Sequence, residues 1–225
     1  MLIPNIRANF NIYIMELETF VLSLIIIHAN LGSIALLAGF LSLAVKKGEK
    51  LHKKSGLIFY YSMLASALTA MIIAMIPHHE NPFLFAIGVF SSYFIITGKR
   101  AIKFKTTKPH LKTDKIISLI MVITGLLMII LPLMLNHSLN IILLIFGALG
   151  GTLALRDLKL YKAPEKLQEK WLKLHLSKML GGYISATTAF IVVNQLIPGI
   201  YGWLIPSIIG SLYITFWVRK LSPKP

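Results

Sequence analysis

The chain has 225 residues and a formal net charge of +15; 56% of its residues are hydrophobic and only 14% are charged. A soluble domain is about 25% charged and does not gather its apolar residues into runs that could cross a bilayer. The composition therefore excludes an ordinary soluble protein. Because the chain has no cysteine, disulfides, thiolate metal sites and cysteine nucleophiles are excluded as well.

Seven apolar stretches are long enough for transmembrane helices, which need about 17 to 25 residues. Backbone amides in hydrocarbon must be bonded within their own segment, and period-two alternation is missing, so helices are expected rather than a strand barrel. The first stretch is too long for a cleavable signal peptide, and we expect a true span. The predicted spans of this single membrane domain, residues 1–225, are 19–45, 57–76, 83–103, 116–135, 139–155, 179–197 and 200–218.

Basic residues are distributed very unevenly among the connections between these spans. Residues 46–54, 99–115 and 156–178, together with the C-terminal tail, hold 22 of the 23 lysines and arginines. The alternate connections PHHENP, NHSLN and QLIPGIYG hold none. Lysine and arginine accumulate on the cytoplasmic side of membranes. The sequence therefore predicts an all-α integral membrane protein of a bacterial plasma membrane, with its N-terminus outside and its C-terminus in the cytoplasm.

The segment KKGEKLHKKSG, residues 46–56, contains five lysines and a histidine. It is either a nucleic-acid site or an anchor against anionic lipid headgroups. The orientation signal explains the whole charge distribution, and no aromatic or RNP-like pattern accompanies the lysines. We therefore expect the bilayer and its anionic headgroups as partners, and no nucleic acid.

Residues 163–176, in the third basic connection, are predicted to form a separate amphipathic helix. Pro164 suits a first helical position. An apolar face is formed by Leu167, Trp171 and Leu174. We expect this helix to lie along the membrane surface.

An internal repeat is a further hypothesis. Spans two, four and six each follow a histidine, and spans three, five and seven each end near an arginine, namely His52, His110, His175, Arg100, Arg156 and Arg219. One interpretation is three parallel helical hairpins after a leading first helix. The other is that such matches arise by chance in connections so rich in basic residues.

His28 is an ionisable residue inside a predicted span, which makes it a functional candidate. It precedes Lys46 by 18 residues, or about 27 Å at 1.5 Å per residue. Asn194 falls at a similar depth on the sixth span, so we expect a hydrogen bond between the two side chains. That bond would line a polar pocket, or it would only join two helices.

Three histidines, His52, His110 and His175, are predicted to lie at one depth near the cytoplasmic face. Converging imidazoles bind zinc, copper or iron, and Asp114 or Asp157 would orient such a ligand. The other interpretation is that these histidines face water or headgroups, because the dense positive field opposes cation binding. No second histidine lies at the depth of His28, which disfavours a bis-histidine haem. The cofactor is left undetermined.

Several membrane chemistries are excluded by the predicted spans. They contain no lysine for a retinal Schiff base and no carboxylate for a proton relay. Walker, GxSxG and HExxH motifs are also missing from the chain. The sequence therefore indicates a protein without catalytic residues, although it does not decide whether the chain is an enzyme.

Four segments, LHKKSGLIFYYSM, FSSYFIITGKRAI, HLSKMLGGYISATTAFIVVN and WLIPSIIG, resemble a bacterial multipass membrane family known as domain-of-unknown-function family 2306. The resemblance covers the chain from about His28 to Trp217 and implies a seven-helix architecture. It implies no reaction and no ligand. It directs attention to the family's recurring polar positions, which here are His28, His52, Arg100, Asp114, His175, Tyr183 and Asn194.

The leading functional hypothesis is a multipass protein that binds or transports a small molecule through a polar pocket in the helical bundle. Small residues that let helices approach closely support it, namely Gly147, Gly150, Gly151, Gly181 and Gly182. One alternative is a membrane redox protein that holds haem, metal or quinone through histidines. Another is a structural or assembly role.

Overall fold

The computed structural model describes residues 3–106 and 109–221, and all regular structure in these ranges is helical. Seven helices are each long and apolar enough to cross a membrane. The prediction of an all-α chain with seven helices of spanning length is therefore confirmed. The elements are α1 (Ile3–Ala44), α2 (Lys50–Ile73), α3 (Pro82–Arg100), the short 3-10 helix η1 (Ala101–Lys105), α4 (Lys112–Asn136), α5 (Ile141–Leu160), α6 (Pro164–Val193) and α7 (Tyr201–Lys220).

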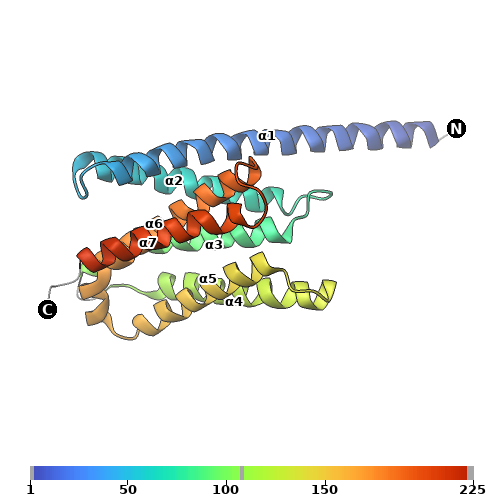
Figure 1. Ribbon diagram of the computed structural model, residues 1–225. Coiled ribbons are helices and arrows are strands. Elements are labelled where there is room, and N and C mark those ends of the chain that lie inside the picture. Colours follow the sequence, from blue (N-terminus) through green and yellow to red (C-terminus); the bar gives the residue numbers. More distant parts are fainter. Residues whose placement is uncertain (1–2, 107–108, 222–225) are drawn as a thin grey trace.

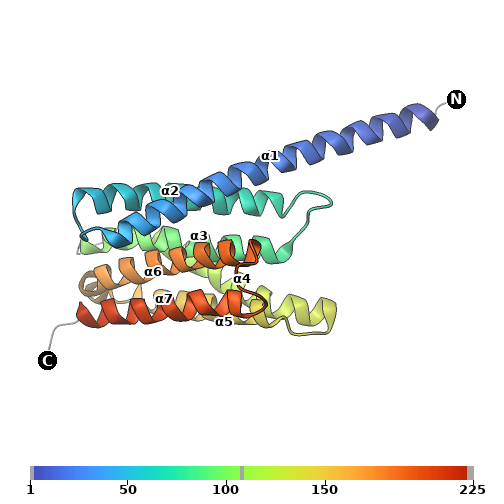
Figure 2. The same cartoon turned by 45° about the horizontal axis from the view of Figure 1, so that its top comes forward.

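The seven helices run up and down in one elongated bundle (Figure 1). The connections after α1, α3 and α5 lie at the same end of the bundle as the last turn of α7, and we call this the basic end (Figures 1 and 2). α1 pairs with α2, α4 pairs with α5, and α6 pairs with α7. α3 contacts α2, α4 and α6 and is the most buried of the seven helices. It forms the centre of the fold.

The helix boundaries follow local sequence signals. The side chain of Asn81 accepts a hydrogen bond from the backbone N–H of Leu84 at 2.9 Å, and Pro82 occupies the first position of α3. Asn140 caps α5 in the same way, through the N–H of Leu143 at 3.0 Å. Asparagine caps satisfy donors that the first helical turn leaves unpaired. These caps fix where the apolar segments enter the bundle.

Glycine allows α4 and α5 to approach backbone to backbone. A Cβ atom on Gly147 would lie 2.6 Å from the carbonyl oxygen of Gly125, and a Cβ on Gly125 would lie 2.7 Å from that of Gly147. Gly150, Gly181 and Gly182 likewise lie against neighbouring side chains, whereas a Cβ on Gly151 would meet nothing within 4 Å. Four of the five glycines singled out in the sequence therefore lie at close contacts.

The prediction of a separate amphipathic helix at residues 163–176 is wrong. This segment is the first part of α6, which continues without a break from Pro164 to Val193. Its apolar face is buried against the protein, because Leu167 is fully buried and packs in one cluster with Ala101, Phe104 and Tyr161. The apolar stripe of this segment therefore packs on the protein's own core at the basic end and not on the membrane surface.

Candidate functional site

A buried ionic cluster joins α3, α5 and α6 near the basic end. The ammonium group of Lys178 lies 2.6 Å from the carboxylate oxygen Oδ2 of Asp157. The hydroxyl of Tyr93 donates to the same oxygen at 2.5 Å and accepts a hydrogen bond from Lys178. All three residues are buried, at 6%, 6% and 2% exposure in the order Lys178, Asp157, Tyr93. Charges this deep need a partner, and here each charge has one.

A second ion pair lies at the start of α4. Nε and Nη2 of Arg100 donate to the two carboxylate oxygens of Asp114, at 2.7 and 2.6 Å. Asp114 is fully buried. A two-point contact of this kind uses the planar fork of the guanidinium group and fixes its orientation. The pair anchors α4 to the end of the central helix α3.

Tyr161, in the connection between α5 and α6, lies between the two ion pairs and interacts electrostatically with Asp157, Asp114 and Arg100. It is 4% exposed. Burial raises the pKa of the Tyr161 hydroxyl, and the negative charge of Asp157 raises it further. The two ion pairs and Tyr161 thus form one polar region, although they come from four different helices and one connection.

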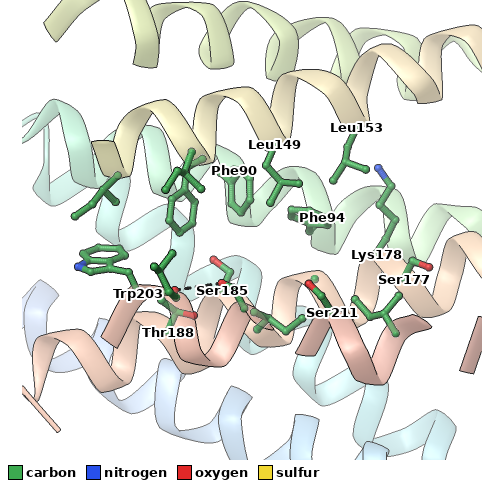
Figure 3. A pocket seen from close by; sticks show the side chains of 18 of the residues that line it. Phe90, Phe94, Leu149, Leu153, Ser177, Lys178, Ser185, Thr188, Trp203 and Ser211 are labelled. Atoms are coloured by element: carbon green, nitrogen blue, oxygen red, sulfur yellow. Dashed lines mark hydrogen bonds between the residues drawn. The ribbon is translucent and has the colours of Figure 1, made fainter. Parts of the chain in front are cut away.

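A cavity of about 340 Å³ lies between α5, α6 and α7, with α3 behind it (Figure 3). Lys178 and Ser177 line one end, and Trp203 and Thr188 lie toward the other. Most of the wall is apolar, and α5 contributes only Ile142, Ile145, Phe146, Leu149 and Leu153. This volume falls in the range of small-molecule sites, about 300 to 1,000 Å³.

Apart from Lys178 and the indole of Trp203, the polar side chains of the cavity wall are hydroxyls from α6 and α7. Ser185 is bonded to Ser91 of α3 at 2.6 Å, and Ser207 donates to the backbone carbonyl of Trp203 at 3.2 Å. Thr188 differs, because its hydroxyl is buried and has no hydrogen-bond partner. Leaving a buried polar group unpaired is unfavourable by about 1 to 3 kcal/mol. The wall of the cavity therefore includes one residue whose hydroxyl is both buried and unpaired.

The predicted hydrogen bond between His28 and Asn194 is wrong. Asn194 is the C-terminal cap of α6, and its side chain donates to the carbonyl of Phe190 on its own helix at 2.9 Å. Nδ1 of His28 lies 2.9 Å from the carbonyl oxygen of Ser66 and 3.0 Å from its hydroxyl, both on α2. Equal depth is not proximity, because the main partner of α1 is α2 and not α6.

His52 makes the same contact in the opposite direction. Its Nδ1 lies 3.0 Å from the carbonyl oxygen of Ser42 on α1 and 3.1 Å from the Ser42 hydroxyl. A carbonyl oxygen can only accept, so Nδ1 carries the proton in both histidines. We call the contacts His28–Ser66 and His52–Ser42 the histidine clamps. They join α1 to α2 at two levels.

The three histidines proposed as metal ligands do not form a site. Nδ1 of His175 lies 2.8 Å from the carbonyl oxygen of Gly98, His52 belongs to a clamp, and His110 is exposed. Across residues 3–106 and 109–221 no group of three His, Asp or Glu side chains could hold a metal ion. The remaining candidate, Tyr183, packs edge-on against Phe59 and lies away from the cavity, with 5.9 Å between the ring centroids.

Arg100 and Asp114 are separate candidates in the sequence, and the structure brings them into contact. The sequence analysis names Asp157 only as a carboxylate that would orient a metal-binding histidine, and it misses Lys178 and Tyr93. The predicted spans themselves hold no lysine and no carboxylate, but Asp157 and Lys178 lie just outside the fifth and sixth of them, within α5 and α6. One signal was available: Lys178 is on the same face of α6 as the small residues Gly181, Gly182 and Ser185, which pack inward.

No family model, no curated protein and no solved structure matches this chain. The resemblance to domain-of-unknown-function family 2306 therefore stays a prediction.

Proposed function

We propose that this chain is a multipass membrane protein that binds a small molecule in the cavity between α5, α6 and α7. The observation that carries the proposal is a cavity of about 340 Å³ whose wall is mostly apolar and includes serine and threonine residues of α6 and α7. Pockets with mostly apolar walls and a few placed polar groups are typical of ligand sites. Lys178, at one end, adds a buried charged donor.

We also propose an orientation of the chain in the membrane and the kind of membrane in which it lies. The bias of lysine and arginine toward one set of connections favours a cytoplasmic basic end, in contact with anionic headgroups, in the plasma membrane of a bacterium. Tags on the two ends test this. We expect the N-terminal tag outside and the C-terminal tag inside, and finding both on one side contradicts the arrangement.

The role of the cavity is tested by filling it. Ser211 lines the cavity from α7, and Ser211→Phe places a ring in the space. The matched control is Ile209→Phe, on the same helix at a position that is 63% exposed and outside the cavity. Protein purified in mild detergent is extracted, and its small molecules are identified by mass spectrometry.

We expect a molecule to accompany the wild-type protein and Ile209→Phe and to be lost from Ser211→Phe. If the same molecule stays with Ser211→Phe in equal amount, the cavity is not its site. If nothing accompanies the wild-type protein, the binding proposal is wrong. Absorption and elemental analysis of the same sample test the redox alternative, which predicts a haem band or bound metal.

A further inference from the structure

We infer that the occupant of this cavity is a neutral lipid with one long apolar chain, whose oxygen-bearing head accepts a hydrogen bond from Lys178. This inference depends on the proposed function, since it names the class of molecule that the cavity would bind. It is carried by the shape of the cavity, the position of its polar groups and the charge of the cluster at its end.

The shape fits a single chain. The lining residues of α5 extend from Ile142 to Leu153, which is about 17 Å along a helix at 1.5 Å per residue. Half of a bilayer's hydrocarbon core is about 15 Å thick. A volume of about 340 Å³ spread along that length describes an elongated slot. Such a shape suits an extended apolar chain lying along α5.

The one charged group of the slot lies at one end. Lys178, with Ser177 and Ser211, lies toward the end nearer the ionic cluster, whereas Thr188 and Trp203 lie toward the other (Figure 3). Apolar surface gains from contact with a hydrocarbon chain, and an oxygen-bearing head needs hydrogen-bond partners when it leaves water. The head is therefore expected beside Lys178 and the chain beside α5.

The charge of the cluster selects a neutral head. Lys178 and Asp157 are one positive and one negative group, 2.6 Å apart and both buried, so the site carries no net charge to offset an ionised head. Bringing a further charge into this low-dielectric position is strongly unfavourable. A lysine ammonium group has three donors. Two of them are directed at Asp157 and Tyr93, which leaves one for a neutral acceptor such as a carbonyl or an alcohol oxygen.

The slot opens toward the bilayer. The backbones of α5 and α7 stay apart where both helices line the cavity, and the two helices meet through the rings of Phe146 and Trp203, whose centroids are 5.9 Å apart. Ile145 and Leu149 on α5 are 40% and 47% exposed, and Ser211 on α7 is also exposed. A lipid could thus move sideways from the membrane into the slot without crossing water.

The test uses four probes that share a long apolar chain and differ in the head. Decylubiquinone carries carbonyl groups, hexadecanol an alcohol, palmitate a carboxylate, and hexadecane no head. Binding is measured by quenching of Trp203, which lines the cavity, in a Trp171→Phe/Trp217→Phe background, and by displacement of decylubiquinone. The indole N–H of Trp217 has no partner, so phenylalanine suits that position.

We expect decylubiquinone or hexadecanol to bind at least about tenfold more tightly than palmitate and hexadecane, a ratio equal to about 1.4 kcal/mol. Quinone binding alone identifies a carbonyl head, and alcohol binding alone identifies a hydroxyl head. In Lys178→Met/Asp157→Leu, which removes both charges together, the preference over hexadecane should disappear. Ser211→Phe should bind none of the probes.

Three results would overturn the inference. Palmitate binding as tightly as the neutral probes shows that the head is not neutral. Equal binding to Ser211→Phe shows that the probes lie elsewhere. Binding of no probe, while a molecule still accompanies the wild-type protein and is lost from Ser211→Phe, removes the lipid inference and leaves the proposed function standing.

Discussion

Lys178 of α6 and Asp157 of α5 form a salt bridge of 2.6 Å inside the helical bundle. Removing one partner of a buried pair leaves the other charge uncompensated, which destabilises a protein by about 3 to 5 kcal/mol. We therefore expect Lys178→Met and Asp157→Leu each to lower the free energy of unfolding by about that amount. The double variant should lose much less than the sum. Unfolding in mixed micelles measures all three, and additive losses would show that the two groups are not coupled.

The contact between Gly125 and Gly147 gives a second prediction. Gly147→Ala places a Cβ atom 2.6 Å from the carbonyl oxygen of Gly125, and backbone cannot move aside as a flexible side chain can. Overpacking of this kind destabilises by about 1 to 3 kcal/mol. Gly151→Ala is the matched control on the same helix, because its Cβ meets nothing within 4 Å. Equal unfolding free energies for the two variants would contradict the close approach of α4 and α5.

Each histidine clamp should stabilise the pairing of α1 with α2. Hydrogen bonds between membrane helices contribute on average about 0.6 kcal/mol. Ser66→Ala removes the hydroxyl but keeps the carbonyl that His28 contacts, so we expect it to lose less stability than His28→Ala. Ser33→Ala is the control, since the Ser33 hydroxyl bonds only to its own helix. A loss for Ser33→Ala as large as that for His28→Ala would refute the clamp.

Arginine at position 100 should not be replaceable by lysine. The guanidinium group donates to both oxygens of buried Asp114, whereas a lysine ammonium group is a point charge without the planar fork. We expect Arg100→Ala to lower the free energy of unfolding by about 3 kcal/mol and Arg100→Lys to recover only part of this loss. Full recovery in the lysine variant would mean that charge alone, without the two-point geometry, holds α4 against α3.

Because of Tyr161, the free energy of unfolding should depend on pH in the alkaline range. Burial, followed by the charge of Asp157, raises the pKa of its hydroxyl in the folded protein, so folding favours the protonated form. That contribution is complete below the unfolded pKa of about 10 and is lost as the pH rises from there toward the folded value. The unfolding free energy should therefore fall more steeply above pH 10 in the wild type than in Tyr161→Phe. Parallel curves for the two proteins would contradict this assignment.

The number and approximate positions of the helices could be predicted, because a run of apolar residues has few alternatives to a membrane helix. The polar sites were harder to predict. Asp157 and Lys178 flank the apolar runs, where charged residues usually belong to connections, and only the packing of α3, α5 and α6 turns them inward. The depth argument for Asn194 failed because depth along the membrane normal does not specify which helices are neighbours.

Arg100 and Asp114 illustrate the same limit. Both are candidates in the sequence, but their contact requires the start of α4 to lie beside the end of α3, which residue spacing alone does not specify. Leu167 and Trp171 likewise showed the expected periodicity. Only the tertiary structure decides whether such a stripe faces headgroups or the protein interior, and here it covers η1 and Tyr161.

The two histidine clamps are copies of one pattern, since His28, Gly32 and Ser42 on α1 recur as His52, Gly56 and Ser66 on α2, each 24 positions later. A Cβ on either glycine would approach the hydroxyl of the serine opposite, at 3.5 Å for Gly32 and 3.4 Å for Gly56. The antiparallel pair thus has an approximate two-fold axis of its own. Sliding one helix past the other by a single turn would break both clamps at once, so the register of this hairpin is an all-or-none property. If α1 and α2 were inserted one turn out of register, neither clamp would form, so no arrangement with only one of the two clamps would be stabilised.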